Sequence, residues 1–419
     1  MASAGGSLGA LKHRNFRLFI SGQFISLVGT WMQQVALGWL VLTLTDSAFA
    51  VGLVSALGAV PVLLFTLQGG GLASRVNRHR ALILLQTGML LEATALTVLT
   101  LTGHVTLGWI ITLTMVHGTL SAFEIPVRQT FLMDLAGRDD LMSAIAFNST
   151  AFNLSRVVGP AIAGVVTALA GPGLVFATNA VSYLAVLISL LVIRLDPALV
   201  RPRTLAPPLA EAMRYILAPG WPRMLVTMTA VYTVFGISFI TMLPVYARDV
   251  LGTGAAGYGG LTSAFGIGAA LAALALASSG GRFRKGGVAL RAGLGIGIVL
   301  LTAALLPWYS IAFLGLAIGG MAAAVNAIIT NTLLQTEAPE HLRGRVIGVY
   351  SFIVVGLAPF GGLQAGLVGE HLGVRIGAGI GGAACLVASI LMLIHASRLR
   401  PSPLTRQWQA TVPSERTQA

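Results

Sequence analysis

Two charged residues stand near the middle of long apolar stretches in this 419-residue chain. They are Glu92 and Arg156. An ionised side chain at the centre of a bilayer costs about 3 kcal/mol or more unless it is paired or reached by water. A residue of this kind therefore marks either a buried structural hydrogen bond or a path for protons, ions or a polar substrate.

Carboxyl groups in this setting are candidates for proton coupling, because burial favours the protonated form near neutral pH. Glu92 is the carboxylate expected at mid-membrane, and Glu124 is the next nearest, at the end of a helix. For Glu92, a protonated group hydrogen-bonded to a neighbour is the competing interpretation. Glu124 can pair with Arg128 four residues later. Pro126 disturbs that spacing, so solvated surface charges are the alternative for this pair.

Arg156 is a candidate for binding a substrate. Its planar guanidinium can hold an anionic or carbonyl-rich group through paired hydrogen bonds. A backbone carbonyl would satisfy the same side chain equally well.

The remaining polar residues form no catalytic or metal-binding pattern. The seven histidines are scattered, so neither a metal site nor an acid–base pair can be assembled from local spacing. The single cysteine, Cys385, provides no disulfide framework. The chain has no phosphate-binding loop of the nucleotide-driven pumps. We expect neither an enzyme nor a bound cofactor.

The elements that must position these residues are membrane-spanning helices. The chain is 56% hydrophobic and 9% charged, which is far too apolar for a soluble enzyme. With about 20 apolar residues per crossing, the sequence predicts an all-α membrane protein of twelve helices. The predicted spans are 17–42, 48–70, 81–102, 107–126, 144–168, 173–193, 224–246, 257–279, 288–306, 309–334, 346–368 and 374–396.

The basic residues indicate how these spans are oriented. The net charge is +13, but the Lys and Arg residues lie between spans rather than in a basic domain, so no nucleic-acid partner is expected. With a cytoplasmic N-terminus, all but three of the 26 fall on the cytoplasmic side or in the tails, the exceptions being Arg156, Arg248 and Arg375. The positive-inside rule therefore places both termini in the cytoplasm.

A polar, proline-rich segment divides the chain into two pseudo-symmetric halves. It contains an amphipathic piece, Leu209 to Leu217, which is expected to lie on the cytoplasmic surface. The sequence repeats weakly across the segment, and Pro160 and Pro359 occupy corresponding places. The predicted organisation is a cytoplasmic N-terminus at 1–16, a six-helix half at 17–193, a linker at 194–223, a second six-helix half at 224–396 and a cytoplasmic tail at 397–419.

Residues Gly69 to Arg80 form a glycine-rich basic turn between the second and third spans. The turn resembles the Gly-x-Leu-Ala-Asp-Arg-x-Gly-Arg-Arg signature of the major facilitator superfamily. The matching residues are Gly70, Leu72, Ala73, Arg75 and Arg78. Ser74 and Asn77 replace the usual Asp and Gly, so the charge relay from this turn cannot form in its usual way. A loop that only fixes topology is the alternative.

Further motifs are similar to those of a bacterial exporter branch that includes enterobactin exporters and macrolide efflux proteins. They are Gln23 to Gly29, Leu42 to Thr45, Pro126 to Gln129, Asn148-Ser149, Asn153 to Pro160 and Arg343 to Arg345. Gly159-Pro160 with Gly164 resembles the antiporter motif of helix five, which implies export, although a packing kink is the alternative. Thr114 stands where many proton-coupled antiporters have an arginine. The residues expected to act in conformational change are Gly70, Arg75, Arg78, Arg80, Arg128, Gly159, Pro160, Gly164 and Pro359.

The resemblance implies a substrate cavity lined mainly by helices one, four, seven and ten. The candidate lining residues, including two from helix five, are Trp31, Gln33, Gln34, His117, Asn153, Arg156, Tyr232, Phe235, Asn326 and Asn331. This mixture of amide and aromatic groups suits a moderately apolar organic molecule. A lone amide or His117 can equally be an interhelical packing partner.

Together these features predict a monomeric transporter in the cytoplasmic membrane of a bacterium. It would export small organic molecules, drugs or siderophore-like metabolites, by alternating access and proton antiport. Its partners would be the substrate, protons and membrane lipids. A lipid or lysolipid flippase of the same fold is the alternative, followed by a membrane-embedded enzyme or a non-transporting receptor.

Overall fold

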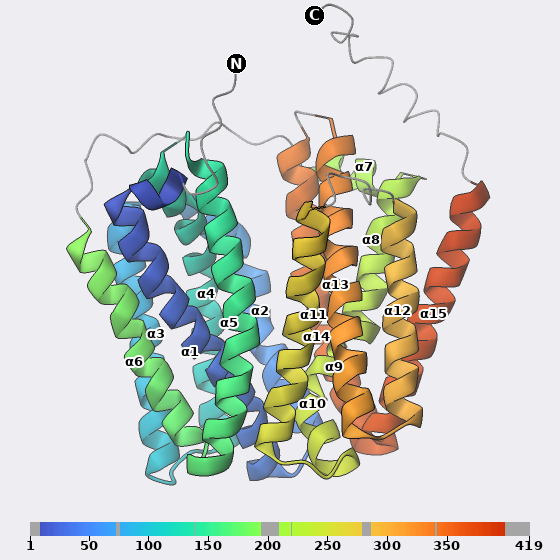
Figure 1. Ribbon diagram of the computed structural model, residues 1–419, viewed down its shortest axis with the longest axis horizontal. Coiled ribbons are helices and arrows are strands. Elements are labelled where there is room, and N and C mark those ends of the chain that lie inside the picture. Colours follow the sequence, from blue (N-terminus) through green and yellow to red (C-terminus); the bar gives the residue numbers. More distant parts are fainter. Residues whose placement is uncertain are drawn as a thin grey trace, which may run out of the picture.

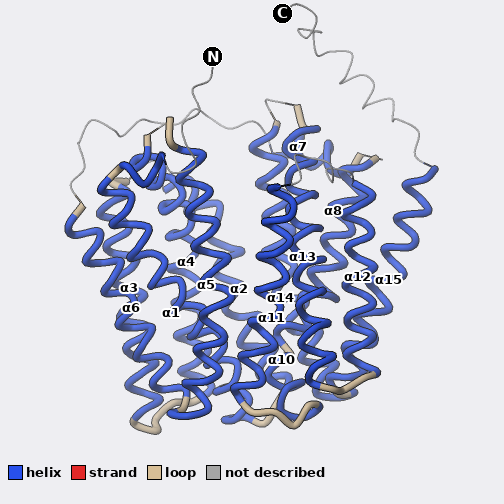
Figure 2. The backbone as a smooth tube through the Cα atoms, in the orientation of Figure 1, coloured by secondary structure: helices blue, strands red, loops and turns tan. Residues whose placement is uncertain are grey.

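The chain folds into a bundle of long helices (Figure 1). The computed structural model describes residues 9–72, 76–137, 139–193, 209–218, 220–278, 286–339 and 342–398. These residues form helices joined by short loops and contain no strand (Figure 2). Twelve helical segments among them are long and apolar enough to cross a membrane. The predicted all-α fold with twelve spans is confirmed.

The first bundle contains six long helices, coloured from blue to green in Figure 1. They are α1 (Arg14–Thr45), α2 (Ala48–Leu72), α3 (Arg78–Leu101), α4 (Leu107–Ala136), α5 (Leu141–Ala170) and α6 (Pro172–Val192). A short 3-10 turn, η1 (Gly9–Lys12), precedes α1. Large side chains such as Phe16, Phe131 and Tyr183 are almost fully buried in the core of this bundle.

The second bundle contains the remaining spans, coloured from yellow-green to red. Its long helices are α8 (Trp221–Val231), α11 (Ala255–Ser278), α12 (Gly286–Leu305), α13 (Tyr309–Glu337), α14 (Arg343–Leu372) and α15 (Val374–Arg398). The span that begins with α8 is not uniform. It continues through a π-helical turn, η3 (Tyr232–Ile237), and α9 (Ser238–Thr241), and is followed by α10 (Leu243–Val245) and a second π-helical turn, η4 (Tyr246–Val250).

The predicted amphipathic piece forms α7 (Leu209–Leu217). Its buried residues Ala212 and Ile216 pack against Val226, Leu334 and Leu342 of the second bundle. Its apolar side therefore faces protein rather than lipid, because the ends of α8, α13 and α14 offer an apolar surface. Residues 194–208 and 219 of the predicted linker lie outside the described residues.

The molecule has two ends that differ in charge. We call the end at which α1 begins and α15 ends the basic end, because Arg14, Arg17 and Arg78 lie there. It is uppermost in Figure 1. The opposite end carries Asp46, which follows α1, and Arg248, which lies in η4.

The most extensive contacts between the two bundles are two helix pairs in which glycines face each other. Where α2 meets α14, a side chain at Gly52 would strike the backbone of Gly362 and Gly366. Where α5 meets α11, Gly164 and Gly259 approach in the same way. Small residues allow such close approach of helix backbones. These contacts lie nearer to the opposite end, and Figure 1 shows the bundles diverging toward the basic end.

Gly52→Val should disrupt the contact between the bundles. The new Cβ would lie 2.5 Å from the Gly362 carbonyl oxygen and 2.9 Å from the Gly366 Cα. We expect a loss of about 1–3 kcal/mol in stability, as for other overpacked contacts. Thermal unfolding can be followed by the reaction of the buried thiol of Cys385 with a thiol-specific dye. Gly348→Val is the matched control, since nothing lies within 4 Å of its Cβ position, and an equal loss in both variants would contradict the prediction.

Candidate functional site

A buried network of polar side chains surrounds Glu92 in the first bundle. Glu92, on α3, is 4% exposed. The side-chain amide of Gln33, on α1, donates to both carboxyl oxygens at 3.1 and 3.3 Å. Nδ1 of His117, on α4, lies 3.2 Å from Oε2 of Glu92. Three helices therefore converge on one carboxyl group.

A fourth helix, α6, fixes the orientation of the Gln33 amide. Asn179 Nδ2 donates to Gln33 Oε1 at 2.7 Å, and the Ser182 hydroxyl lies 3.1 Å from Asn179 Oδ1. Since the Gln33 oxygen is occupied, its NH₂ group is the part that faces Glu92. A side chain at Gly29 would collide with both Asn179 and Ser182, so the packing depends on glycine there. Gln33, a candidate for the cavity, lies in this network.

Glu92 and His117 form an acid–base pair across α3 and α4. The Glu92 side chain is 2% exposed and that of His117 is 22% exposed. Glu92 is therefore enclosed, and its hydrogen bond to the less buried ring of His117 is a direct route for a proton. Local spacing gave no sign of the pair, because residues 25 positions apart meet only through helix packing.

A second buried pair lies on α4, closer to the basic end. Arg128 Nε donates to Glu124 Oε1 at 2.8 Å, and Gln86 of α3 donates to the same oxygen at 3.2 Å. Arg128 also donates to Asn148 of α5 at 3.3 Å. Both charged residues are buried, so the alternative of solvated surface charges is wrong. Pro126 lies within α4, which continues well beyond Glu124 instead of ending near it as predicted.

The basic turn contributes one ion pair within the first bundle. Arg78, at the start of α3, donates through Nη1 to both carboxyl oxygens of Asp134 near the end of α4, at 2.7 and 2.8 Å. Arg80 is exposed, and Gly70 is part of α2. Arg75 lies outside the described residues. Arg78 therefore ties together the ends of two neighbouring helices.

Arg156, on α5, lies between the two bundles. Its guanidinium carbon is 5.6 Å from the ring centre of Trp31 on α1 and 4.9 Å from that of Phe265 on α11. These are cation–π contacts with rings from different bundles. Among the residues that the structure describes, the guanidinium has no hydrogen bond or ion pair.

Several other candidates for the cavity are accessible. Gln34 is exposed, and Trp31, Asn153, Phe235 and Asn331 are partly exposed. They belong to α1, α5, η3 and α13, so both bundles contribute. These side chains remain candidates for contact with a substrate.

Asn326, in contrast, is only 1% exposed. Its Oδ1 accepts a hydrogen bond from the Thr229 hydroxyl at 3.4 Å, and its Nδ2 donates to the Ala289 carbonyl at 3.1 Å. The amide thus joins α13 to α8 and α12. This arrangement matches the alternative interpretation of a lone amide as an interhelical partner.

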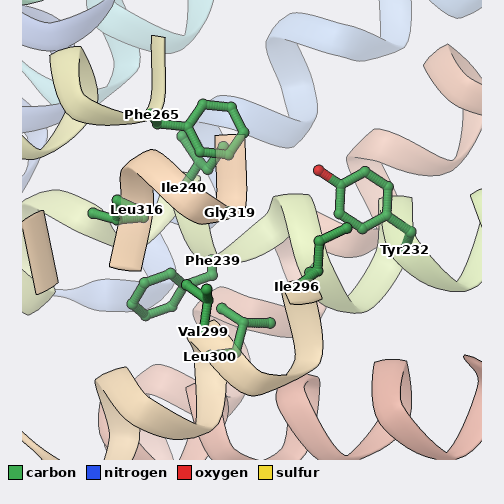
Figure 3. Close-up of a pocket in the computed structure, with 10 residues that line it drawn as sticks. Tyr232, Phe239, Ile240, Phe265, Ile296, Val299, Leu300, Leu316 and Gly319 are labelled. Carbon is green, nitrogen blue, oxygen red and sulfur yellow. The ribbon is translucent and has the colours of Figure 1, made fainter. Parts of the chain in front are cut away.

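A small apolar cavity lies beside Tyr232 in the second bundle (Figure 3). Its volume is about 20 Å³, and its walls include Phe239, Phe265, Ile296 and Leu316. An apolar cavity of this size stays dry, and sites for organic ligands are many times larger. Tyr232 therefore borders a packing void, and its contact with a substrate stays a prediction.

Two of the helices that contain a proline, α5 and α14, make equivalent contacts in the two bundles. Gly159 packs against α1 of its own bundle, whereas Gly164 packs against α11 of the other. The helix continues through Pro160. Likewise, α14 continues through Pro359 and contacts η3 of its own bundle and α2 of the other. This correspondence agrees with a duplicated six-helix unit.

Comparison with known proteins identifies the family. The family described as "Transmembrane secretion effector" matches residues 5–414. The chain belongs to this family. It is therefore a major facilitator superfamily transporter, and the predictions of a transporter and of a protein that is not an enzyme are confirmed.

Several relatives of this protein have named activities. The staphyloferrin A transporter of Staphylococcus aureus is 30% identical over 236 residues, which are 56% of this chain and 59% of that protein. The multidrug efflux pump Tap of Mycolicibacterium fortuitum is 28% identical over 83% of this chain and 87% of that protein. The enterobactin exporter EntS of Shigella flexneri is 27% identical over 93% of each chain.

The fold is also similar to that of solved transporter structures. A bacterial homolog of the human lysosomal transporter Spinster, in an inward-facing and unoccupied conformation, gives a TM-score of 0.70. The similarity covers 91% of this chain and 95% of that chain at 14% sequence identity. At this identity the comparison shows a shared fold alone.

Removing one partner of the Glu124–Arg128 pair should destabilise the protein. Arg128→Met leaves a buried carboxylate without its cation, so we expect a loss of about 3–5 kcal/mol in stability. Adding Glu124→Gln removes the second charge and should recover most of that loss. The melting midpoint, followed by dye access to Cys385, measures both effects. Strictly additive losses would show that the two residues are not coupled.

Proposed function

We propose that this protein exports small organic molecules across the bacterial cytoplasmic membrane and that protons moving inward drive the export. The observation that carries the proposal is the buried carboxyl group of Glu92, which is paired with His117 and held by Gln33. Such a pair can bind and release a proton within a membrane-spanning bundle. The multidrug efflux pump and the enterobactin exporter among its relatives favour outward transport of a drug or a siderophore-like metabolite.

Contacts at the opposite end support a state that is open toward the basic end. Arg248 of the second bundle pairs with Asp46 of the first at 2.6 Å. Glu370 accepts hydrogen bonds from the Ser47 hydroxyl at 3.0 Å and from the Phe49 backbone amide at 3.1 Å. Because the positive-inside rule assigns the basic end to the cytoplasm, this state would take up substrate from inside the cell.

Protonation of the acid–base pair would bias the exchange between access states. An ionised Glu92 needs the Gln33 amide and a protonated His117 around it, because a buried charge is stable only when it is paired and hydrogen-bonded. A neutral Glu92 is stable without a charged partner. The proton therefore changes the relative free energies of two arrangements of α1, α3, α4 and α6.

Replacing Glu92 by Gln tests the coupling. Glu92→Gln preserves the shape of the protonated carboxyl group but cannot release a proton, so uphill export should be lost while downhill exchange persists. The assay uses proteoliposomes with an imposed pH gradient and three probes: a cationic dye, a neutral macrolide and enterobactin. We expect at least a tenfold lower gradient-driven rate for any probe that the wild type carries.

The control is Glu337→Gln, which changes an exposed carboxylate near the basic end. It should transport at the wild-type rate. If Glu92→Gln, Glu124→Gln and the double variant all concentrate a probe against its gradient, carboxylate coupling is wrong. Movement of a fluorescent lysolipid in place of all three probes would favour a flippase.

Glu370→Gln should loosen the contact at the opposite end, because a neutral amide oxygen is a weaker acceptor than a carboxylate. Ala48 is buried and its Cβ is next to Gly369 of α14. In a Cys385→Ala background, Ala48→Cys can be labelled with a maleimide reagent only when α2 and α14 separate. We expect labelling to be about fivefold faster, which corresponds to about 1 kcal/mol. Unchanged labelling would show that Glu370 does not stabilise this state.

A further inference from the structure

The guanidinium of Arg156 takes no part in the hydrogen-bond networks described above. Arg128, a second arginine at the interior of the first bundle, is paired with Glu124 at 2.8 Å. Arg156 instead contacts the rings of Trp31 and Phe265, and within the described part of the chain it has no acceptor for its N–H groups. The rings stabilise the positive charge, but the N–H donors of the guanidinium remain available for hydrogen bonds.

The backbone that carries this side chain is held firmly between the bundles. The Ser263 hydroxyl of α11 donates to the Val157 carbonyl of α5 at 2.9 Å. A side chain at Gly266 would come within 2.7 Å of the Arg156 carbonyl oxygen. The guanidinium is therefore presented from a close and ordered contact of α5 with α11, which reduces the entropy lost when it binds a ligand.

A guanidinium in this setting selects an anion with two adjacent oxygens. Cation–π contacts contribute about 0.5–2 kcal/mol, but aromatic rings cannot accept the five in-plane N–H donors in the way that oxygens do. A carboxylate or a catecholate matches the planar fork and neutralises the charge. The flanking Trp31 and Phe265 rings add an apolar surface for the rest of such a molecule.

The depth of Arg156 excludes a lipid head group at either membrane surface as the anion. Arg156 lies 15 residues after Leu141 and 14 before Ala170, the ends of α5. At about 1.5 Å per residue it is about 21–23 Å from each end. Phe152, one turn toward the basic end, is 41% exposed, and Gln34 on α1 is also exposed. An anion bound at Arg156 would therefore lie far from both membrane surfaces.

We propose that Arg156 binds the acidic group of the transported molecule, so that this protein carries organic acids, carboxylates or catecholates, with an apolar or aromatic body. The inference rests on the proposed export function and names its class of substrate. Because Trp31 and Phe265 belong to different bundles, the bound acid would contact both bundles where they must separate during transport.

Matched pairs of ligands test the inference. Each pair consists of an aromatic carboxylic acid and its primary amide, such as 2-naphthoate and 2-naphthamide. We add 2,3-dihydroxybenzoate with its primary amide as a pair that also carries a catechol. Binding to the purified full-length protein in nanodiscs is measured by equilibrium titration. We expect the wild type to bind acids at least about tenfold more tightly than the amides, a difference typical of a charge-assisted hydrogen bond.

Variants separate charge from geometry. Arg156→Gln should abolish the preference for acids, and Arg156→Lys should retain part of it, because an ammonium keeps the charge but loses the planar fork. Arg14→Gln, at an exposed position on α1, is the control and should leave the preference intact. Equal binding of acids and amides by the wild type would overturn the inference even if Arg156→Gln fails to fold. An acid preference that survives in folded Arg156→Gln would also overturn it.

Transport distinguishes this inference from the proposed function. The wild type could export the cationic dye or the macrolide but neither export nor bind acids. That result would support the export function and contradict the acid site at Arg156. Acid-selective binding without transport of any probe would support the site and argue against export. Loss of acid export in Arg156→Gln, with any export of neutral probes retained, is the result expected if both are correct.

Discussion

The interior of a bilayer offers no water to polar groups, so the protein itself must satisfy every buried charge. This constraint acts most strongly at Glu92, whose carboxyl group depends on Gln33 and His117. Gln33 in turn depends on Asn179. A buried donor or acceptor that loses its partner costs about 1–3 kcal/mol. The packing of α1, α3, α4 and α6 is therefore tied to the state of one carboxyl group.

The two bundles share a helix plan but differ in the chemistry of their interiors. In the described residues of the first bundle, charged pairs occupy the contact between α3 and α4, at Glu92–His117 and at Glu124–Arg128. The second bundle instead contains an interhelical amide at Asn326, a π-helical turn and a dry cavity. Such π-helical turns are frequent at functional sites. The buried charged residues of the described chain thus lie in the first bundle, while the second has a local irregularity in its helix packing.

The contact between the bundles depends on small residues. Glycines at the α2–α14 and α5–α11 contacts let the backbones approach closely without interlocking large side chains. Polar contacts at the opposite end, from Arg248 and Glu370, add hydrogen bonds that can be broken in water at modest cost. A contact built in this way can close tightly and still separate, as alternating access requires.

The sequence by itself determined the class of the protein and its helices. Hydrophobic stretches must be long enough to cross the bilayer, so the number of spans follows from composition and length. The motifs around Gly70 and Pro160 identified the superfamily. The bounds of the helices followed less closely, since the predicted span 107–126 stops ten residues before α4 ends at Ala136. The same patterns marked Glu92 and Arg156 as unusual, since charges are costly at that depth.

Only the tertiary structure decided what those residues contact. His117 meets Glu92 from 25 positions away, and Asn179 meets Gln33 from 146 positions away. Helical periodicity specifies which residues share a face, but not which face of another helix lies against it. Burial of Glu124 with Arg128 and the position of Arg156 between two aromatic rings depend on how α1, α3, α5 and α11 pack. Partners that come from separate helices exist only once those helices are assembled.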